Sequence, residues 1–321
     1  MRLRVNNGSM NTKVNAGKRF SRLGWWVALA AIAMLSVAGS ACSGNGAPAG
    51  GVMKVIVTSY SLQYFAQRIG GDAVSVVNLV PPGVEAHDYE PNSGDLRTLG
   101  AAGIVVYNGG GFDPWVDRAL ATKKASQVVV MALQAAEGKT AYATAHPEDP
   151  HIWLDPVLAV EEVRLISDAM EQARSAEAAQ FKANGDALIA DLQALDERIR
   201  AGLASCKQRT LAVSHEAFGH FAARYNLEQV ALAGISPDAE PSPGDLADIT
   251  EKLRALGARY VLTEPIVSPQ LAQTIAKEIG AELLPFHPLE SLTPDEVQRG
   301  ETYFTIMDTN LQNLRKALEC G

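Results

Sequence analysis

Residues 52–83, VMKVIVTSYSLQYFAQRIGGDAVSVVNLVPPG, decide the fold class. The β-branched run at residues 54–58 predicts a buried strand, residues 62–69 predict a helix, and residues 74–79 predict a second strand that ends before Pro81-Pro82-Gly83. A strand, a helix and a strand in this order form a βαβ unit, in which the two strands are parallel.

The same alternation continues along the chain. A helix from Ser93 leads to a strand at residues 103–107, and after Arg209 strands are expected at residues 211–213, 230–232, 260–263 and 281–284, followed by a closing helix to Leu318. We therefore expect an α/β protein with two parallel-sheet lobes, at residues 52–155 and 206–321.

Residues 156–205, between the lobes, are rich in Ala, Leu, Glu, Arg and Gln and have apolar positions at helical spacing. As one rigid helix joining the lobes, the segment would be about 70 Å long at about 1.5 Å per residue. A break near Asn184-Gly185 would instead give two helices, and the sequence leaves this alternative open.

The first 41 residues have the features of a secretory signal peptide. Six basic residues and no acidic ones precede an apolar run at residues 25–38, which is shorter than the roughly 20 residues of a membrane span. Cleavage before Cys42 resembles the bacterial lipoprotein signal, although Gly39 stands where that signal usually has Leu. We expect Cys42 to be lipidated, followed by a flexible linker to residue 51; ordinary cleavage after Ala41, which leaves a free thiol, is the alternative.

The net charge indicates which ligands the chain does not bind, and the cysteines indicate a disulfide bond. The net charge is −8, and removal of the six basic residues of the signal peptide brings the mature chain to −14, which argues against binding to nucleic acid. Cys206 and Cys320 are then the two remaining cysteines. Because exported proteins are exposed to an oxidising compartment, we expect a disulfide between them, with two buried free thiols as the alternative.

Four of the six histidines follow predicted strands, two in each lobe, in loops at the carboxyl edge where open α/β sheets bind ligands. Each lies in a short motif: Pro-Pro-Gly-Val-Glu-Ala-His87-Asp-Tyr-Glu-Pro, Asp-Pro-His151-Ile-Trp-Leu-Asp-Pro, Ser-His215-Glu-Ala-Phe and Phe-His287-Pro-Leu. Four imidazoles at equivalent strand ends predict a metal site between the lobes.

These motifs, together with Thr263-Glu264-Pro265, occur in the order found in a known family. Over nearly all of its mature sequence the chain resembles the metal-binding lipoproteins of zinc and manganese ABC importers, the zinc-uptake or adhesin-like family. The resemblance implies two α/β lobes joined by a long helix, one metal between the lobes, and His87, His151 and His215 as ligands. It also implies partners, an ABC permease and its ATPase.

The sequence leaves alternatives open for the fourth ligand. His287 stands where many family members have a carboxylate, and we expect it to complete a set of four histidines; Glu264 or water is the alternative. An all-nitrogen site favours Zn²⁺, and members that prefer manganese have Glu where this chain has His215, which also disfavours Mn²⁺. Mn²⁺, another divalent metal or a metal chelate is the alternative cargo.

Acidic residues near the histidines are expected to fix the imidazole tautomers, and the candidates are Asp155, Glu264 and Glu90. His146 is expected to be a solvated loop residue. His220 is expected to pack near the site.

A zinc hydrolase is the main enzymatic alternative. His215 and His220 are five residues apart, whereas the metalloprotease signature needs a separation of four, and four protein ligands leave no open position for a catalytic water. A binding protein for an organic metal chelate would need an aromatic pocket, and the chain is only 6% aromatic. We expect a monomeric, non-enzymatic zinc-binding lipoprotein anchored to the outer face of the cell membrane.

Overall fold

The computed structural model describes residues 51–121, 124–239 and 241–321. The expected signal peptide, Cys42 and nearly all of the expected linker lie outside the described residues. Among the described residues, no helix combines the length and the apolar character needed to cross a membrane.

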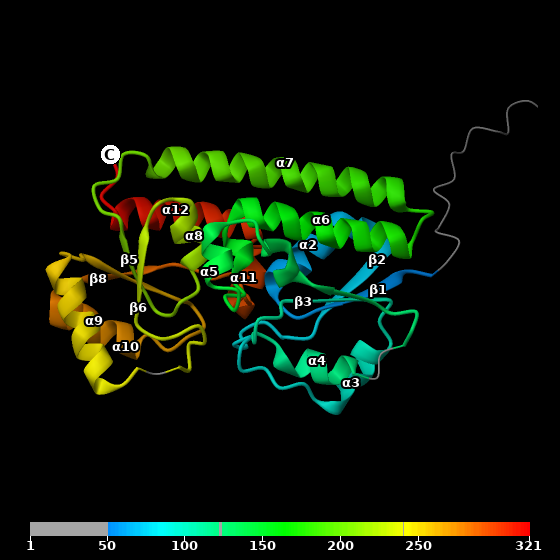
Figure 1. The fold of residues 1–321 in the computed structure, drawn as a ribbon, viewed down its shortest axis with the longest axis horizontal. Helices are drawn as coiled ribbons and strands as arrows, with labels where there is room; N and C mark the ends of the chain where they lie inside the picture. The colour runs from blue at the N-terminus through cyan, green and yellow to red at the C-terminus, as the bar shows by residue number, and fades with distance from the viewer. Residues whose placement is uncertain (1–50, 122–123, 240) are drawn as a thin grey trace, which may run out of the picture. The chain divides into compact units, whose positions relative to one another are not determined.

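The first sheet has four parallel strands in the order β2-β1-β3-β4. Its two central strands are mostly buried, as is typical of parallel strands covered on both faces, whereas its two edge strands are mostly half-buried. They are β1 (Met53–Val57), β2 (Val74–Asn78), β3 (Ile104–Tyr107) and β4 (Val128–Met131). In Figure 1, α3 and α4 lie on one side of this sheet and α2 on the other.

Short helices connect the strands of this first part of the chain or follow its last strand. They are α2 (Tyr60–Gly70), η1 (Gly71–Ala73), α3 (Ser93–Gly100), α4 (Pro114–Leu120), η2 (Ala132–Ala136), α5 (Ala141–Ala145) and η3 (Ile152–Leu154). Helix α3 begins with a reciprocal capping box between Asn92 and Asp95, which satisfies backbone N–H groups at the helix start.

The second sheet repeats the topology of the first, with strand order β6-β5-β7-β8, all parallel. The strands are β5 (Thr210–Val213), β6 (Glu228–Ala231), β7 (Tyr260–Thr263) and β8 (Glu282–Pro285). The helices are α8 (Gly219–Arg224), α9 (Pro243–Ala255), α10 (Gln270–Ile279), α11 (Pro294–Arg299) and α12 (Tyr303–Ala317). The prediction of two parallel α/β sheets is confirmed; β4 is a strand that the sequence analysis did not name.

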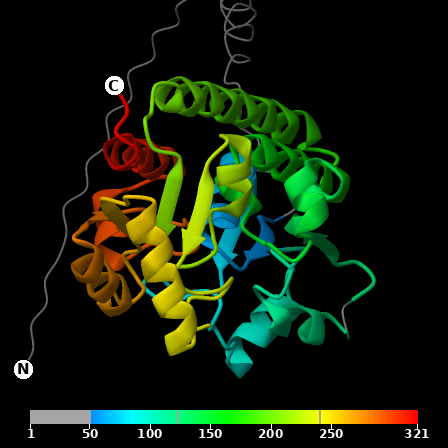
Figure 2. The same cartoon turned by 60° about the vertical axis from the view of Figure 1, so that its left-hand side comes forward.

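The helical segment between the sheets is made of two helices rather than one continuous rod. α6 (Pro156–Ala173) ends at Arg174, and α7 (Ala178–Leu203) begins four residues later and runs back along it. Figures 1 and 2 show the pair lying side by side above the strands. The expected helical content is confirmed, but the break lies at residues 174–177 instead of Asn184-Gly185.

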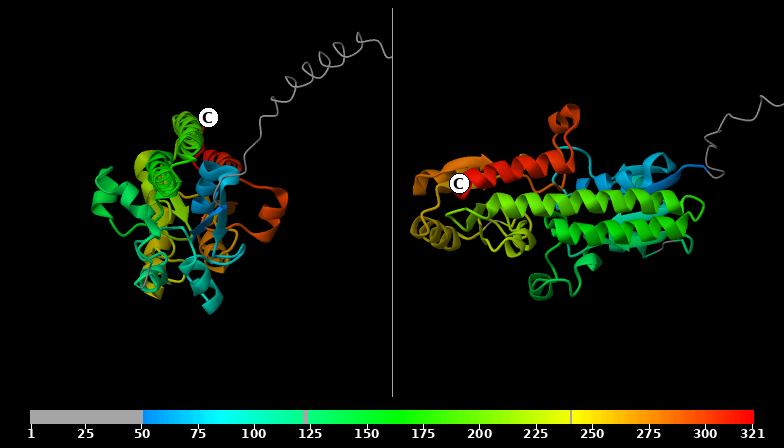
Figure 3. Two further views of the ribbon diagram at one scale, coloured as in Figure 1. Left: turned by 90° about the vertical axis from the view of Figure 1, so that its right-hand side faces the viewer. Right: turned by 90° about the horizontal axis from the view of Figure 1, so that it is seen from above.

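Gly185 serves packing and does not interrupt α7. A Cβ atom at this position would lie 2.9 Å from Ser167 Oγ on α6, so glycine allows the two helices to approach closely. α7 packs against α2 of the first part and α12 of the second, and Figure 3 shows it running lengthwise along both. At about 1.5 Å per residue, its 26 residues span about 39 Å, enough to connect the two sheets.

The second part is closed by a disulfide bond between Cys206 and Cys320, as predicted. The described residues form one compact unit. The lobe boundaries at residues 155/156 and 205/206 therefore stay a prediction.

Candidate metal centre

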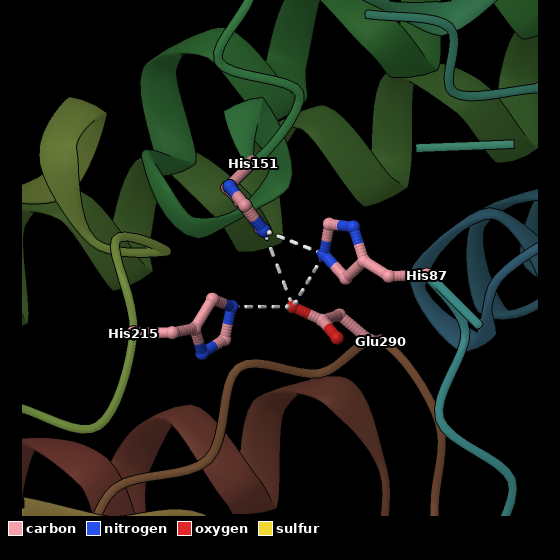
Figure 4. A group of neighbouring side chains, drawn as sticks. All are labelled: His87, His151, His215 and Glu290. Atoms are coloured by element: carbon pink, nitrogen blue, oxygen red, sulfur yellow. Dashed lines mark hydrogen bonds and ion pairs between the residues drawn. The ribbon is translucent and has the colours of Figure 1, made fainter. Parts of the chain in front are cut away.

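Four side chains that are distant in the sequence meet in the interior. His87 lies on the loop after β2, His151 just before η3, His215 two residues after β5, and Glu290 on the loop between β8 and α11. Figure 4 shows their side chains pointing toward one another from separate segments. The carboxyl ends of parallel strands are the usual ligand-binding edge of an α/β sheet.

The four ligating atoms are spaced like the corners of a metal site. His87 Nε2 lies 3.2 Å from His151 Nε2. Glu290 Oε1 lies 3.3 Å from Nε2 of both His151 and His215, and 3.7 Å from Nε2 of His87. Since donor atoms about 2.0 Å from a tetrahedral ion stand about 3.3 Å apart, this spacing fits a zinc-sized ion.

Burial strengthens this interpretation. The side chains of His151 and His215 are fully buried, and that of Glu290 is 3% exposed. His215 Nε2 and both carboxylate oxygens of Glu290 are buried without a directed hydrogen bond from the described residues. Because buried polar atoms almost always have a partner, unpartnered atoms aimed at one point fit a metal ion.

The electrostatics of the group are set by burial and by neighbouring charges. Burial lowers the pKa of His87, against the opposing effect of Glu290. Burial also acts to lower the pKa of His151 and His215, but Asp149 and Glu290 raise the pKa of His151, and Glu264 and Glu290 raise that of His215 well above its usual value. Burial acts to raise the pKa of Glu290, but the three histidines together have the larger effect and hold this pKa well below its usual range.

Two of the three imidazoles contact a carboxylate through Nδ1, the ring nitrogen that does not face the other ligands. Asp149 Oδ1 lies 2.8 Å from His151 Nδ1, and Glu264 Oε1 lies 2.6 Å from His215 Nδ1. A proton on Nδ1 leaves the Nε2 lone pair free for an ion, and a carboxylate partner raises the basicity of the ring. The hydroxyl of Tyr142 in turn donates to Asp149 Oδ2.

His287, expected as the fourth ligand, is not part of this group, and Glu290 takes the fourth position. His287 Nδ1 accepts a hydrogen bond from the backbone N–H of Leu289, and its Nε2 faces Glu296 Oε2 at 3.4 Å. Nδ1 is therefore occupied by a backbone N–H, whereas Nε2 is buried beside Glu296 and makes no directed hydrogen bond with the described residues. The backbone turns between His287 and Glu290 and presents the carboxylate to the other three ligands.

The other candidate residues from the sequence, two acidic residues and two histidines, are not part of the cluster. Asp155 caps the start of α6 and forms an ion pair with Arg224, so it does not support a ligand, and Glu90 is exposed. The side chain of His146 is 49% exposed, whereas His220 is buried and its Nε2 donates to the carbonyl of Asp149.

Sequence reasoning missed Glu290 and Asp149. Glu290 is in the same loop as His287, after the last predicted strand, so a search for every carboxylate at strand ends would have included it. Asp149 lies in the Asp-Pro-His motif that was singled out for His151. Both carboxylates are thus close in the sequence to a histidine that was predicted as a ligand.

A comparison with known protein families shows which family the chain belongs to. Residues 55–317 match the family of the zinc-uptake complex component A, periplasmic. The chain belongs to this family. The resemblance inferred from the histidine motifs is thus confirmed, and this zinc-uptake family is one of transport proteins rather than enzymes.

Individual relatives within the zinc-uptake family support the assignment. The chain is 33% identical over 292 residues to the zinc-binding lipoprotein AdcA of Streptococcus pneumoniae serotype 4, which covers 87% of this chain and 58% of AdcA. It is 31% identical over 311 residues to the high-affinity zinc uptake system protein ZnuA of Bacillus subtilis, covering 92% of this chain and 97% of the relative. The chain thus spans little more than half of AdcA.

The fold agrees with solved structures of the zinc-uptake family. The crystal structure of the Zn(II)-bound ZnuA-like domain of Streptococcus pneumoniae AdcA superposes with a TM-score of 0.73 at 33% identity. The match covers 84% of this chain and 100% of that domain.

Proposed function

We propose that this chain is an extracytoplasmic solute-binding protein that captures Zn²⁺ and delivers it to the permease of an ABC importer. The observation that carries the proposal is the convergence of Nε2 of His87, His151 and His215 with Glu290 Oε1: all four atoms lie within 4.8 Å of one another, and Glu290 Oε1 lies 3.3–3.7 Å from each of the three nitrogens. Zn²⁺ accepts this combination of imidazole nitrogen and carboxylate oxygen in tetrahedral geometry.

The donor set supports zinc over manganese. Three nitrogens and one oxygen are softer than the oxygen-rich sets that suit Mn²⁺, although Cu²⁺ and Ni²⁺ bind such sites well in a test tube. The relatives are named for zinc: AdcA as a zinc-binding lipoprotein and ZnuA as part of a high-affinity zinc uptake system. Which metal the protein carries in the cell depends on the supply of each metal as well as on the affinity of the site.

The geometry supports carriage of the ion rather than hydrolysis. Four protein donors fill a tetrahedral site and leave no position for an activated water. Burial of His151 and His215 also favours a bare ion over a metal held in an organic chelate.

The proposal also covers the partners of the chain and its attachment to the membrane. A component of an uptake complex needs a permease and an ATPase, and we propose that the chain meets them as a monomer held on the outer face of the cell membrane by a lipid on Cys42. Cys42→Ser should move the protein from the membrane fraction to the soluble fraction. Retention on the membrane would refute the lipid anchor without affecting the metal site.

Metal titration of the purified full chain tests the central function. We expect one Zn²⁺ per chain, and a large loss of affinity in Glu290→Ala because the buried cluster loses its only ligating carboxylate. The matched control is His146→Ala, which removes an exposed histidine outside the cluster and should bind like the native chain. A native chain that binds no zinc, or a control that loses as much affinity as Glu290→Ala, would contradict the proposal.

A further inference from the structure

The loop that carries Glu290 is attached on both sides to the first part of the chain. Three hydrogen bonds do this: Trp153 Nε1 donates to the carbonyl of Pro288, Tyr60 N–H to that of Glu290, and Gly83 N–H to that of Leu292, each at 2.7 Å. With these carbonyls fixed, the direction of the Glu290 side chain depends on the backbone turn just before it.

That turn has an unusual conformation. Leu289 has φ = 62°, in the left-handed region that non-glycine residues rarely adopt, and its side chain is fully buried. The backbone N–H of Leu289 donates to Nδ1 of His287 at 2.8 Å. A side chain that accepts from the N–H two residues later stabilises a turn, as Asn and Asp commonly do.

His287 is itself held in place, so it can fix this turn. Asn310 Oδ1 accepts from the N–H of His287, and Asn310 Nδ2 donates to the carbonyl of His287, at 2.9 and 2.8 Å. Because Nδ1 accepts from Leu289, the ring proton is on Nε2, which faces Glu296 Oε2. His287 is 6% exposed; Nδ1 has the Leu289 N–H as its partner, and Nε2 is buried 3.4 Å from Glu296 Oε2 without a directed hydrogen bond.

We propose that His287 is a positioning residue for the metal site: its Nδ1 holds the left-handed turn at Leu289 and thereby directs the Glu290 carboxylate toward the three ligating histidines. This inference rests on the proposed zinc-binding function. It assigns His287 a role that acts through Glu290 and involves no contact with the ion.

The first test compares His287→Ala with His287→Asn in the full chain. Alanine removes the acceptor for the Leu289 N–H, and we expect zinc affinity to fall about 10-fold or more, as when other groups that orient metal ligands are removed. The amide oxygen of asparagine can accept the same N–H, so His287→Asn should restore affinity to within about 3-fold of the native chain. The absorption spectrum of bound Co²⁺ in His287→Asn should match that of the native chain, because the ligands are unchanged.

The second test is a double-mutant cycle with Glu290→Gln. If His287 acts through Glu290, adding His287→Ala to Glu290→Gln should produce little further loss of affinity, whereas independent effects would add. A general structural defect would weaken binding equally in both backgrounds.

The outcomes separate this inference from the proposed function. If the native chain binds zinc and His287→Ala binds equally well, or His287→Asn is as weak as His287→Ala with an altered Co²⁺ spectrum, the positioning role is wrong and the zinc-binding function stands. Full additivity in the cycle would also refute it. A native chain that binds no zinc would overturn both.

Discussion

Replacing Glu264 with glutamine isolates the contribution of a buried charge behind a metal ligand. Glu264 Oε1 lies 2.6 Å from His215 Nδ1, and the two side chains are 2% and 0% exposed. Glutamine keeps the shape and an acceptor oxygen but removes the charge that makes the imidazole more basic. Loss of such a partner typically weakens metal binding about 10- to 100-fold, which corresponds to about 1.4 to 2.7 kcal/mol.

Proton competition gives this prediction a pH dependence of known sign. In the metal-free chain Glu264 raises the pKa of His215, against the effect of burial, so zinc must displace a proton near neutral pH. Glu264→Gln should lower the pKa of His215, so that protons compete less with zinc at low pH. This offsets part of the loss of zinc affinity there. The affinity ratio between native chain and variant should therefore increase from about pH 6 to about pH 9, and fewer protons should be released per zinc near neutral pH.

Chelator competition across this pH range measures the ratio, and calorimetry in two buffers of different ionisation enthalpy counts the protons. Glu162→Gln is the matched control, because it makes the same substitution at another buried glutamate that is not part of the cluster. The reasoning is refuted if Glu264→Gln binds zinc as tightly as the native chain at every pH and releases the same number of protons.

Two predictions concern stability. Glu162 is fully buried without a hydrogen-bond partner among the described residues, and burial raises its pKa well above 4.5. Its protonated form therefore contributes stability that is present below about pH 4.5 and is lost as pH rises toward the folded pKa, by up to about 1.4 kcal/mol per pH unit. Urea unfolding of metal-free Glu162→Gln should match the native chain near pH 4 and show greater stability near pH 8; equal stability at both pH values would contradict this. The Cys206–Cys320 disulfide spans 114 residues, so replacing both cysteines with serine should lower the free energy of unfolding by about 5 kcal/mol in the chain-entropy model, and an unchanged urea midpoint would contradict it.

Much of the fold follows from local sequence patterns. The Val and Ile runs of β1 and β3 have no strong alternative to a buried strand, and the order of strand and helix then requires parallel sheets. The three ligating histidines were predictable for the same reason, because each motif is in a loop at the carboxyl edge of a predicted sheet.

The features that the sequence did not predict depend on tertiary contacts. Residues 174–177 contain no proline or glycine, so the sequence has no strong local signal for a helix end there. In the fold, α7 packs back on α6 with Gly185 against Ser167. The fourth ligand follows Leu289, whose backbone is left-handed, a conformation that leucine does not favour. Local sequence does not predict this turn, and His287 was predicted as the fourth ligand, with Glu264 or water as the alternative.

Anomalous diffraction from zinc-soaked crystals of the chain tests the central claim most directly. We predict one zinc peak at about 2.0–2.2 Å from Nε2 of His87, His151 and His215 and from a carboxylate oxygen of Glu290. A peak bound by His287 Nε2, or a zinc ion that lacks Glu290 as a ligand, would contradict it.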